Sequence, residues 1–525
     1  MKILFVEASF KSTEPMNIML LSATAKQKGH KVFVHVFGDG DLRENLERID
    51  PDLVAYSATT GDHHSCLQAN TIVKKHNQRI FTIMGGRHPT FCPEVIRDSD
   101  LDAICVGEGD DAWPELLETL ERSGDINSIS NIVTMENFND YSIRPRISDL
   151  DRLPFLDYDL TDQEPLVRNP ILGRSKRRAM MTSRGCPYAC TYCFNHIYNK
   201  IYRGKGPVVS RQSVGRVITE AKYINERWLT KFVKFYDDDF VLGLDDWLRE
   251  FSERWPSEVG LPFHCLLRAN VIAKEPEIMA LLKKAGMQSI TMSVEAGNDY
   301  VRNQLFNRNM PREVIKKAFA TAWDLGVYTF SNSILAVPVA REEESKHHLP
   351  SASARDIESL DLNLEIRTTM TEYPILFPYP KTVIGEYCRE HGFFEGDFDS
   401  FTMSYKTQSP MKCFSRRERR VQQNLAILGT VLQAFAGSGS RWIRALTPAL
   451  RLVTIKLLIK LPFGKIYLLP YVGAVTYLIK KKLYPRGKLT MWEWLKGIPG
   501  SYSFNLKQQF QKIDHAKPPS AAETA

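Results

Sequence analysis

The stretch SRGCPYACTYCFNH, residues 183–196, places three cysteines inside eight residues, at Cys186, Cys190 and Cys193. The chain has nine cysteines in 525 residues, so this grouping is a local feature and not part of a disulfide framework. The first residues, MKILFVEASF, lack the length and the small-residue cleavage site of a signal peptide. We therefore expect a reducing, cytoplasmic compartment, where clustered cysteines indicate a metal or catalysis.

Three thiolates on one loop suit an iron–sulfur cluster. A 4Fe–4S cubane has four corners, each usually held by a cysteine, and three cysteines close in sequence can hold three of them. The fourth iron then stays open for a substrate or cofactor, as a catalytic metal site requires. Two alternatives remain open from the residues alone: a structural zinc site completed by His196, and three unrelated thiols on one turn.

The residues around the cysteines alternate between strands and helices. The strand RRAMMTSRG leads into the cysteines, and amphipathic helical patterns then separate the runs KFVKFYDDDF, FHCLLRAN, QSITMSVEAG and VYTFSNSILAVP. The pattern predicts a partial (β/α)6 barrel of the TIM type over residues 176–385. The cysteines fall on the loop after its first strand, where such barrels carry active-site groups.

Residues 1–140 show a separate alternation of the same kind. Strand-like runs are KILFVEA, KVFVHVF, PDLVAYSAT, RIFTIMGG and DAICVGEGD, with helical patterns between them. They predict an α/β domain with a doubly wound parallel sheet, flavodoxin-like or Rossmann-like, covered by helices on both faces. Ligands bind such sheets beyond the carboxyl ends of the strands, where the polar and glycine-rich segments SATTGDHH, GGRHPT and GEGDDAW fall.

The Cys-x3-Cys-x2-Cys pattern after the first barrel strand resembles the radical S-adenosylmethionine (SAM) superfamily. The resemblance implies that the three cysteines hold a 4Fe–4S cluster whose open iron binds SAM, and that an electron from the cluster splits SAM into a 5′-deoxyadenosyl radical. It also implies SAM contacts from Tyr192, Asp237, Asp238, Arg268, Ser293 and Glu295. From the residues alone, the tyrosine fits loop packing and one of the aspartates fits a helix cap equally well.

The segment GGRHPTFCPEVIRDSDLDAICVGEGDDAWPELLETL, residues 85–120, resembles the cobalamin-binding domain that is fused to many radical SAM enzymes. The resemblance implies cobalamin contacts from Ser57, Thr59, Gly85, Gly86, Gly107, Glu108 and Gly109. Without it, the glycines fit tight strand–helix turns. The motif Asp-x-His-x-x-Gly, which supplies a histidine below cobalt, is absent, as is usual in this branch.

Two segments depart from the pattern of the relatives. A motif that usually reads Gly-x-Pro-Gly-Glu after the fifth strand starts here at Ala336, and a YPYPGT-like segment has Lys381 in place of glycine. Both changes place the local backbone path in question.

The remaining segments carry charge or little pattern. Residues 141–175 are rich in Asp, Pro and Arg and are predicted to be a linker lying over the surface, while 386–511 are predicted to be helical and 512–525 a disordered tail. Residues 441–490 hold 11 Lys and Arg and no Asp or Glu, whereas the whole chain has a net charge of +8. The basic excess is therefore local and not a nucleic-acid-binding signature of the whole chain.

The basic region has two interpretations. Eight of its cations interleave with Leu, Ile and Val as in an interfacial helix, namely Arg441, Arg444, Arg451, Lys456, Lys460, Lys480, Lys481 and Lys482. This favours peripheral membrane contact or an anionic or lipid-like substrate; a helix packed on the barrel with a wet basic face is the alternative. The longest uncharged apolar run has 14 residues, fewer than the roughly 20 that span a bilayer, so we predict no transmembrane segment.

With a 4Fe–4S cluster, SAM and cobalamin together, the resemblance implies methyl transfer to an unactivated carbon. Ring formation or rearrangement is the alternative chemistry, and a non-catalytic cobalamin- or metal-binding sensor is the alternative class. The expected partners are a small-molecule substrate and an electron donor such as flavodoxin or ferredoxin, without nucleic acid.

Overall fold

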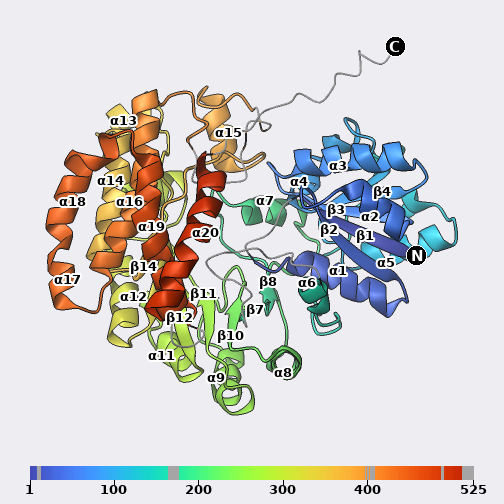
Figure 1. The fold of residues 1–525 in the computed structure, drawn as a ribbon, viewed down its shortest axis with the longest axis horizontal. Helices are drawn as coiled ribbons and strands as arrows, with labels where there is room; N and C mark the ends of the chain where they lie inside the picture. Colours follow the sequence, from blue (N-terminus) through green and yellow to red (C-terminus); the bar gives the residue numbers. More distant parts are fainter. Residues whose placement is uncertain are drawn as a thin grey trace.

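Two parallel sheets and a set of C-terminal helices make up the fold, as a computed structural model shows (Figure 1). The structure describes residues 1–8, 13–163, 177–396, 398, 401, 408–485 and 490–510. The predicted tail and residues 164–175 of the predicted linker lie outside these residues. In Figure 1 the N-terminal domain lies to the right and most of the C-terminal helices lie to the left.

The first sheet has the strand order β2-β1-β3-β4-β5-β6, with only β6 antiparallel to its neighbour. Its strands are β1 (Lys2–Glu7), β2 (Lys31–Val36), β3 (Leu53–Ser57), β4 (Phe81–Gly85), β5 (Ala103–Cys105) and β6 (Ile132–Val133). Its helices are α1 (Met16–Gln27), α2 (Leu42–Ile49), α3 (His63–His76), α4 (Arg87–Phe91) and α5 (Ala112–Glu121). The order 2-1-3-4-5 is flavodoxin-like and confirms the predicted sheet.

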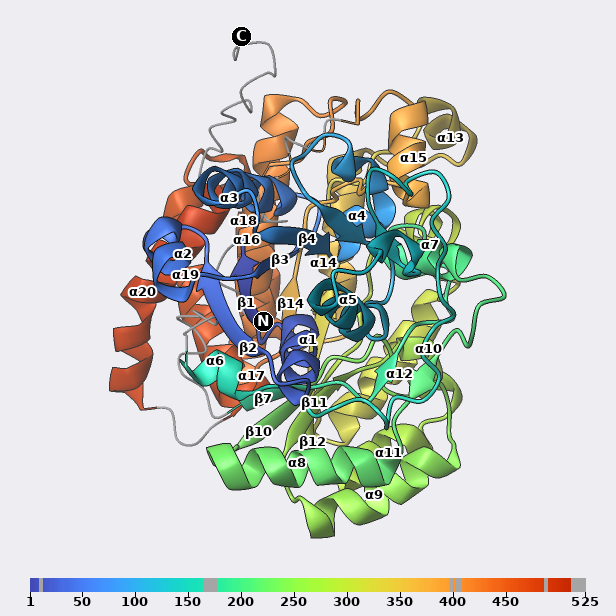
Figure 2. The same ribbon diagram turned by 90° about the vertical axis from the view of Figure 1, so that its right-hand side faces the viewer.

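Helices cover both faces of this sheet because both faces of its strands are apolar. One core contains side chains of α1 and α5, and the other contains side chains of α2 and α3. Figure 2, seen from the side of the N-terminal domain, shows α1 and α5 together on the near side.

The second sheet is parallel throughout, with the order β14-β13-β12-β11-β10-β7. Its strands are β7 (Arg177–Met180), β10 (Phe232–Phe235), β11 (Phe263–Leu266), β12 (Met287–Thr291), β13 (Tyr328–Asn332) and β14 (Met370–Glu372). A short antiparallel pair, β8 (Ser183–Arg184) and β9 (Ser210–Arg211), flanks it. Six parallel strands without pairing between the first and the last confirm the predicted partial barrel.

The barrel strands are followed by helices that cover the outside of the sheet. They are α7 (Phe194–Ile201), α8 (Val214–Trp228), α9 (Asp246–Glu258), α10 (Ala269–Lys274), α11 (Glu277–Lys284), α12 (Arg312–Asp324), α13 (Arg341–Lys346), α14 (Ala352–Glu365) and α15 (Val383–Glu390). A π-helical turn, η3 (Val301–Leu305), precedes α12.

The C-terminal region is helical, as predicted. It consists of α16 (Arg416–Ala436), α17 (Arg441–Ala445), α18 (Thr447–Lys456), η5 (Leu458–Lys460), α19 (Gly464–Leu478), η6 (Ile479–Leu483) and α20 (Met491–Phe510). Helix α16 packs on α14 and β14, and α19 packs between α16 and α20. Among the described helices, none is long and apolar enough to span a bilayer.

The end of η6 closes the lower mouth of the barrel. Tyr484, which follows η6, packs edge-on against Phe232 at the start of β10 and against His264 near the start of β11. The Ser289 hydroxyl of β12 donates to the Leu483 carbonyl at 2.6 Å. Because these are the amino ends of the strands, the carboxyl ends are left for the site.

The described part of the predicted linker, residues 141–163, lies over the surface only in part, because several of its side chains are buried. Arg146, Leu150 and Tyr158 are 8%, 3% and 1% exposed. The Arg146 guanidinium donates to the Val208 carbonyl at 2.7 Å, and the Tyr158 hydroxyl donates to the Ala179 carbonyl at 2.9 Å. A few large side chains in this otherwise polar segment are enough to anchor it to the barrel. Such scattered residues give no periodic pattern, so the sequence did not indicate these contacts.

At both departures from the relatives, the residue that stands in place of glycine has a left-handed backbone. Ala336 has φ +58° and Lys381 has φ +62°, both in the left-handed region. The local backbone is therefore one that glycine adopts without cost, and the chain carries strain at these residues, because a left-handed non-glycine residue costs roughly 1–2 kcal/mol.

Replacing Lys381 with glycine is expected to stabilise the protein by about 1 kcal/mol, because the exposed lysine buries nothing and glycine removes the strain. Denaturant unfolding measures the change. Lys231→Gly, at an exposed residue without positive φ, is the matched control and should destabilise by about 0.5 kcal/mol. Equal destabilisation by both substitutions would contradict the assignment of strain.

A buried carboxyl group supports the loop that contains Ala336. Asp356 of α14 is 3% exposed, and its Oδ1 accepts the Ala336 N–H at 3.0 Å, while Oδ2 has no hydrogen-bond partner among the described residues. Burial raises the pKa of Asp356 to about 7. The protonated form is thus favoured in the folded state.

Stability should therefore depend on pH through Asp356. Since its pKa is raised on folding, its favourable contribution is complete below the ordinary pKa of about 4 and is lost as pH rises through about 7. Asp356→Asn keeps the acceptor and cannot ionise, so relative to wild type it should gain about 3 kcal/mol between pH 4 and pH 8. Unfolding at both pH values tests this, with Asp324→Asn on the exposed end of α12 as the control that shows no such gain.

Candidate functional site

A cavity of about 440 Å³ lies between the carboxyl edge of the first sheet and the loop that carries the cysteines. From the N-terminal domain it is lined by Ser57, Gly85, Gly86, Gly107, Glu108 and Gly109, among others. From the barrel it is lined by residues that include Met181, Arg184, Gly185, Phe194, Asn195, Tyr236 and Asp238. The two domains thus share one site.

Six of the seven residues predicted for cobalamin line this cavity; Thr59 is the exception. Its hydroxyl donates to Asp62 at 3.0 Å, at the start of α3. These residues meet at one edge because they follow β3, β4 and β5, which are parallel neighbours.

The four glycines at this edge of the sheet fall into two groups, according to whether the protein itself has room for a side chain there. Gly86 and Gly107 have φ of +101° and +86°, and a Cβ would lie 2.6 Å from the Ala58 carbonyl oxygen or 2.1 Å from the Tyr202 hydroxyl, so the protein's own packing requires them. A Cβ at Gly85 or Gly109 would make only ordinary contacts, at 3.7 and 3.6 Å. Open backbone at these two glycines, together with the apolar side chains in the wall, fits the face of a flat macrocycle such as cobalamin.

The histidines near this edge face away from the cavity. The rings of His63 and His64, and of His63 and His88, have centroids 3.7 Å apart, and none of the three lines the cavity. Burial lowers the pKa of His63 to about 2 and of His88 to about 4. The stacked rings of His63 and His88 are therefore neutral, and none of the three histidines lies in the cavity wall, which is consistent with the absence of the cobalt-ligating histidine motif.

The three cysteines follow β8 on one loop, and Cys193 is the N-cap residue of α7. All three are free thiols, and the Cys193 N–H donates to the Cys190 carbonyl at 3.1 Å. Burial raises the pKa of Cys186 and of Cys193 to about 12, so a bound metal is needed to hold them as thiolates.

The donor set fits a cubane better than a single ion. In the part of the chain that the structure describes, no group of three His, Cys, Asp or Glu residues is close enough to hold one metal ion, which argues against a zinc site that includes His196. A 4Fe–4S cubane takes each thiolate at a separate iron, so its ligands need not converge on one point.

Two arginines lie against Cys190. Arg268 donates to its sulfur at 3.2 Å and stacks on Tyr188, with 3.8 Å from the guanidinium carbon to the ring centroid. Arg308 lies 3.9 Å from the same sulfur, and its guanidinium also donates to the Tyr192 hydroxyl at 3.1 Å. Hydrogen bonds and positive charge at a ligand sulfur favour the thiolate and adjust the potential of a cluster.

Four of the six residues predicted for SAM meet around Arg308. Its guanidinium binds the Tyr192 hydroxyl, donates to the Ser293 carbonyl at 2.8 Å and lies 3.9 Å from Glu295. Arg268, the fourth, donates to the Arg308 carbonyl at 2.6 Å. The sequence pattern missed Arg308, because it lies in the loop FNRNMP, which has no motif of its own.

Glu295 has the features of a functional carboxylate. It is 9% exposed, burial raises its pKa, and its φ is +66°. A buried acid on a strained backbone beside cations is typical of a binding site for a polar ligand. Carboxylate and guanidinium groups together suit the ammonium, carboxylate and hydroxyl groups of SAM.

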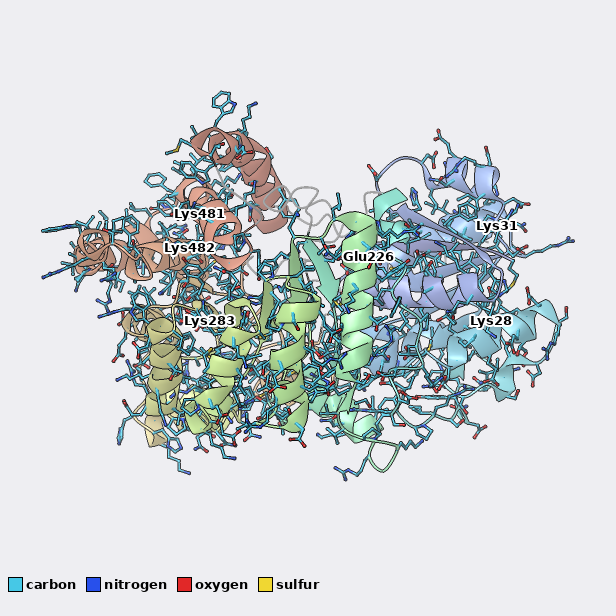
Figure 3. All side chains as sticks on the ribbon, turned by 90° about the horizontal axis from the view of Figure 1, so that it is seen from below. Lys28, Lys31, Glu226, Lys283, Lys481 and Lys482 are labelled. Atoms are coloured by element: carbon cyan, nitrogen blue, oxygen red, sulfur yellow. The ribbon has the colours of Figure 1, made fainter. Side chains whose placement is uncertain are left out.

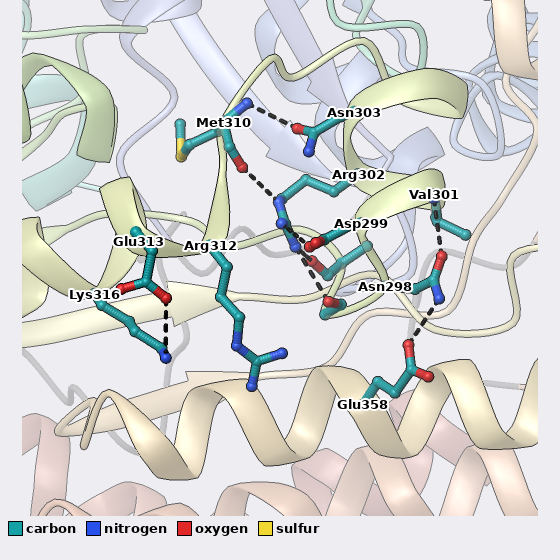
Figure 4. Close-up of polar contacts among 12 residues, drawn as sticks. Asn298, Asp299, Val301, Arg302, Asn303, Met310, Arg312, Glu313, Lys316 and Glu358 are labelled. Carbon is teal, nitrogen blue, oxygen red and sulfur yellow. Dashed lines mark hydrogen bonds and ion pairs between the residues drawn. The ribbon is translucent and has the colours of Figure 1, made fainter.

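Another arginine, the fully buried Arg302, holds the loop from Glu295 to Arg308 in place (Figure 4). Arg302 donates to the carbonyls of Ala296 at 2.8 Å and Met310 at 2.7 Å, and also binds Asp299. Asn298 binds Glu358 of α14 at 2.8 Å. These contacts hold both ends of the loop, so that the side chains predicted to contact SAM are positioned before a ligand arrives.

The three consecutive aspartates have three different environments. Asp237 is 1% exposed, its Oδ1 accepts from Thr182 and Ser183 at 2.7 and 2.6 Å, and it does not line the cavity. Asp238 does line it. Asp239 accepts the Arg268 N–H at 3.0 Å and lies 3.6 Å from the Cys186 sulfur.

The cysteine loop is attached to the N-terminal domain by polar contacts that the sequence did not indicate. Arg184, two residues before Cys186, forms a bidentate pair with Asp110 at 2.7 and 2.9 Å. The Tyr202 hydroxyl at the end of α7 accepts the Glu108 N–H at 2.7 Å. The loop that would hold the cluster and the edge that would hold cobalamin are therefore directly connected.

Known protein families match the N-terminal domain and the barrel separately. Residues 3–117 match the family described as the B12 binding domain, and residues 180–349 match the Radical SAM superfamily. The matched ranges contain the cobalamin edge and the cysteine loop, respectively.

Among curated proteins, the chain is 26% identical over 352 residues to an uncharacterized methyltransferase of Pyrococcus horikoshii, covering 66% of this chain and 71% of that protein. It is 22% identical over 360 residues to the anaerobic magnesium-protoporphyrin IX monomethyl ester cyclase of Rubrivivax gelatinosus, covering 64% and 63%. The chain thus spans about two thirds of the length of each relative.

Among solved structures, the chain is similar to TsrM of Kitasatospora setae, a radical SAM methyltransferase with cobalamin and a [4Fe-4S] cluster bound. The TM-score is 0.56 at 15% identity, covering 74% of this chain and 78% of that chain. At this identity the likeness concerns the fold.

Proposed function

This chain belongs to the radical SAM superfamily and carries a B12-binding domain, and from that premise we propose that it transfers a methyl group to an unactivated carbon. The observation that carries the proposal is the shared cavity, which has the cobalamin edge on one wall and the cysteine loop on the other. A substrate in this space would lie between a source of radicals and a source of methyl groups.

The residues of the chain divide the work of binding. Cys186, Cys190 and Cys193 would hold the cluster, and the residues around Arg308 would hold SAM. When bound, the cluster and SAM supply reductive cleavage to a 5′-deoxyadenosyl radical, and cobalamin supplies the methyl group. Arg268 stabilises the Cys190 thiolate, and the apolar cavity wall excludes water from a reactive radical.

We further propose that the substrate is a small molecule and that the electron comes from a small redox protein such as flavodoxin or ferredoxin. Ring formation on the same cofactors is the second candidate, since one of the relatives is named a cyclase.

Product stoichiometry distinguishes the two. Anaerobically reconstituted protein is incubated with reductant, methylcobalamin, methyl-deuterated SAM and a small-molecule extract of anaerobic cells. Methyl transfer should yield 5′-deoxyadenosine and S-adenosylhomocysteine in equal amounts and a deuterium-labelled product, because one SAM gives the radical and another restores the methyl group. 5′-Deoxyadenosine without S-adenosylhomocysteine would overturn methyl transfer in favour of ring formation, and the absence of both would overturn the enzymatic proposal.

A further inference from the structure

The C-terminal helices expose an unusual number of large apolar side chains. Of the 21 large apolar side chains that are exposed among the described residues, 13 lie in residues 442–495, about a tenth of the chain. They are Trp442, Ile443, Leu446, Leu452, Val453, Leu457, Phe463, Ile466, Leu469, Tyr477, Met491, Trp492 and Leu495. We call the exposed part of α17 to α20 the C-terminal surface, and such a concentration on one region marks an interaction site.

Helix α18 has the opposite of the burial pattern of an ordinary packed helix. Its one fully buried side chain is the polar Thr454, whereas Leu452 and Val453 are 55% and 48% exposed. Helices α17 and α18 form the outer margin of the molecule in Figure 1. A helix that packs on the barrel with a wet basic face, the alternative considered from the sequence, would bury these apolar residues and expose the threonine.

Helix α19 carries apolar residues on both sides. It buries side chains such as Leu468, Val472 and Val475, and also exposes Ile466 and Leu469 at 59% and 50%. Helix α19 packs on both α16 and α20, and the side chains of Ile466 and Leu469 nevertheless stay at least half exposed.

Cations surround these apolar groups. Residues 441–490 contain no Asp or Glu, and exposed basic side chains on the C-terminal surface include Arg441, Lys456, Lys460, Lys465 and Lys481. Within the described ranges, none of these five forms an ion pair. Figure 3 shows Lys481 and Lys482 among the C-terminal helices, on the opposite side of the molecule from Lys28 and Lys31 of the N-terminal domain.

Not every cation of the region is available. Arg451 pairs with Asp361 of α14, and the Lys482 ammonium donates to the Tyr328 hydroxyl at 3.1 Å. These two hold the helices on the barrel, which leaves the five exposed cations without such a structural role.

From these observations we propose that the C-terminal surface docks the protein on an anionic lipid bilayer. Exposed tryptophan, leucine and isoleucine side chains can enter the boundary between headgroups and acyl chains, and the lysines and arginines meet the negative headgroups. A second copy of the chain is a poor occupant, because a symmetric interface would bring together two surfaces on which the cations far outnumber Glu493, the one acid in residues 441–510. The membrane meets both the apolar and the charged requirement.

Vesicle flotation tests the proposal with the full-length protein. Wild type should float with phosphatidylcholine vesicles that contain phosphatidylglycerol, much less with phosphatidylcholine alone, and less as salt is raised. Lys456→Glu/Lys460→Glu should weaken binding at least about 25-fold, since each lysine near an anionic surface contributes about fivefold. Trp442→Ser/Trp492→Ser should weaken it at least about tenfold.

Matched controls on the N-terminal domain are Met135→Ser, at a side chain that is 58% exposed, and Lys75→Glu, at an exposed lysine. Both should bind vesicles as wild type does. Brominated lipids should quench part of the tryptophan fluorescence of wild type, because Trp442 and Trp492 are 85% and 65% exposed, and this readout does not depend on variants folding.

The proposal is overturned if wild type stays with the unfloated fraction at low salt, or if the C-terminal and control variants bind equally well. It is also overturned if wild type binds no vesicles but forms a concentration-dependent dimer, and the Trp442→Ser/Trp492→Ser variant does not form that dimer. None of these outcomes depends on SAM cleavage, so this inference and the proposed function can fail separately.

Discussion

Alanine at Cys186, Cys190 or Cys193 is expected to remove the iron from anaerobically reconstituted protein and to lower 5′-deoxyadenosine formation at least about a thousandfold. Each thiolate holds one corner of a 4Fe–4S cube, and the open corner is already reserved for SAM. Two remaining thiolates cannot keep the cube in place, and without it no electron reaches the sulfonium. Iron and sulfide content, the visible spectrum and 5′-deoxyadenosine are measured together on each variant.

The chain provides its own control for this experiment. Cys413 is an exposed free cysteine outside the loop, and Cys413→Ala should keep iron content, spectrum and activity at the wild-type level. Cys413→Ala goes through the same purification and reconstitution as the other variants. Equal loss of iron from Cys413→Ala and Cys190→Ala would therefore contradict the assignment of the cluster ligands. So would a protein without Cys186, Cys190 and Cys193 that still holds four irons.

The fold could be predicted because its signals are local. Strand and helix periodicities in residues 1–140 and 176–385 repeat many times, and each repeat supports the same layered arrangement. The position of Cys186 to Cys193 after the first barrel strand follows from these elements alone. The same reasoning placed six of the seven cobalamin residues on one cavity wall, since the ends of parallel strands meet at one edge.

The polar connections of the site could not be predicted, because they join segments distant in the chain. Arg308 and Tyr192 are 116 residues apart, and Arg184 and Asp110 are 74 residues apart. Neither arginine lies in a periodic pattern that would distinguish it from a solvated one. Only the tertiary structure decides which arginine is buried beside an acid.

The aspartates of YDDDF show the same limit at the level of single residues. In the sequence, Asp237, Asp238 and Asp239 are equivalent, and the resemblance to relatives favoured the first two as SAM contacts. Burial separates them: Asp237 supports the segment that leads into the cysteines, and burial raises its pKa to about 6. Asp238 remains at the cavity, whereas Asp239 orients Arg268.

The pair between Arg184 and Asp110 should be a strong polar contact between the two domains. Arg184→Met is expected to lower the free energy of unfolding by about 3 kcal/mol, because Asp110 would remain buried without its partner. The Asp110 side chain is 8% exposed and that of Arg184 is 26% exposed. Although burial alone would raise the pKa of Asp110, the Arg184 guanidinium holds it below the ordinary value.

The same pair predicts a pH dependence with a definite sign. Because the pKa of Asp110 is lowered on folding, the stability that the pair contributes is present above the ordinary carboxyl pKa of about 4 and is lost as pH falls through the lowered value. Wild type should therefore lose its advantage over Arg184→Met on acidification. Denaturant unfolding of both proteins at neutral and at acidic pH measures this difference.

A double-mutant cycle and a neighbouring pair complete the test. Arg184→Met/Asp110→Asn should be more stable than Arg184→Met, since the second change removes the unpaired charge, and the coupling energy should be about 2 kcal/mol. Arg152 and Asp111 form a similar bidentate pair one residue further along the same loop, but their side chains are 47% and 42% exposed. Arg152→Met should therefore cost less than about 1 kcal/mol. If both arginine variants lose the same stability, burial is not what makes the Arg184 pair strong, and the cysteine loop is not attached to the N-terminal domain in the way described.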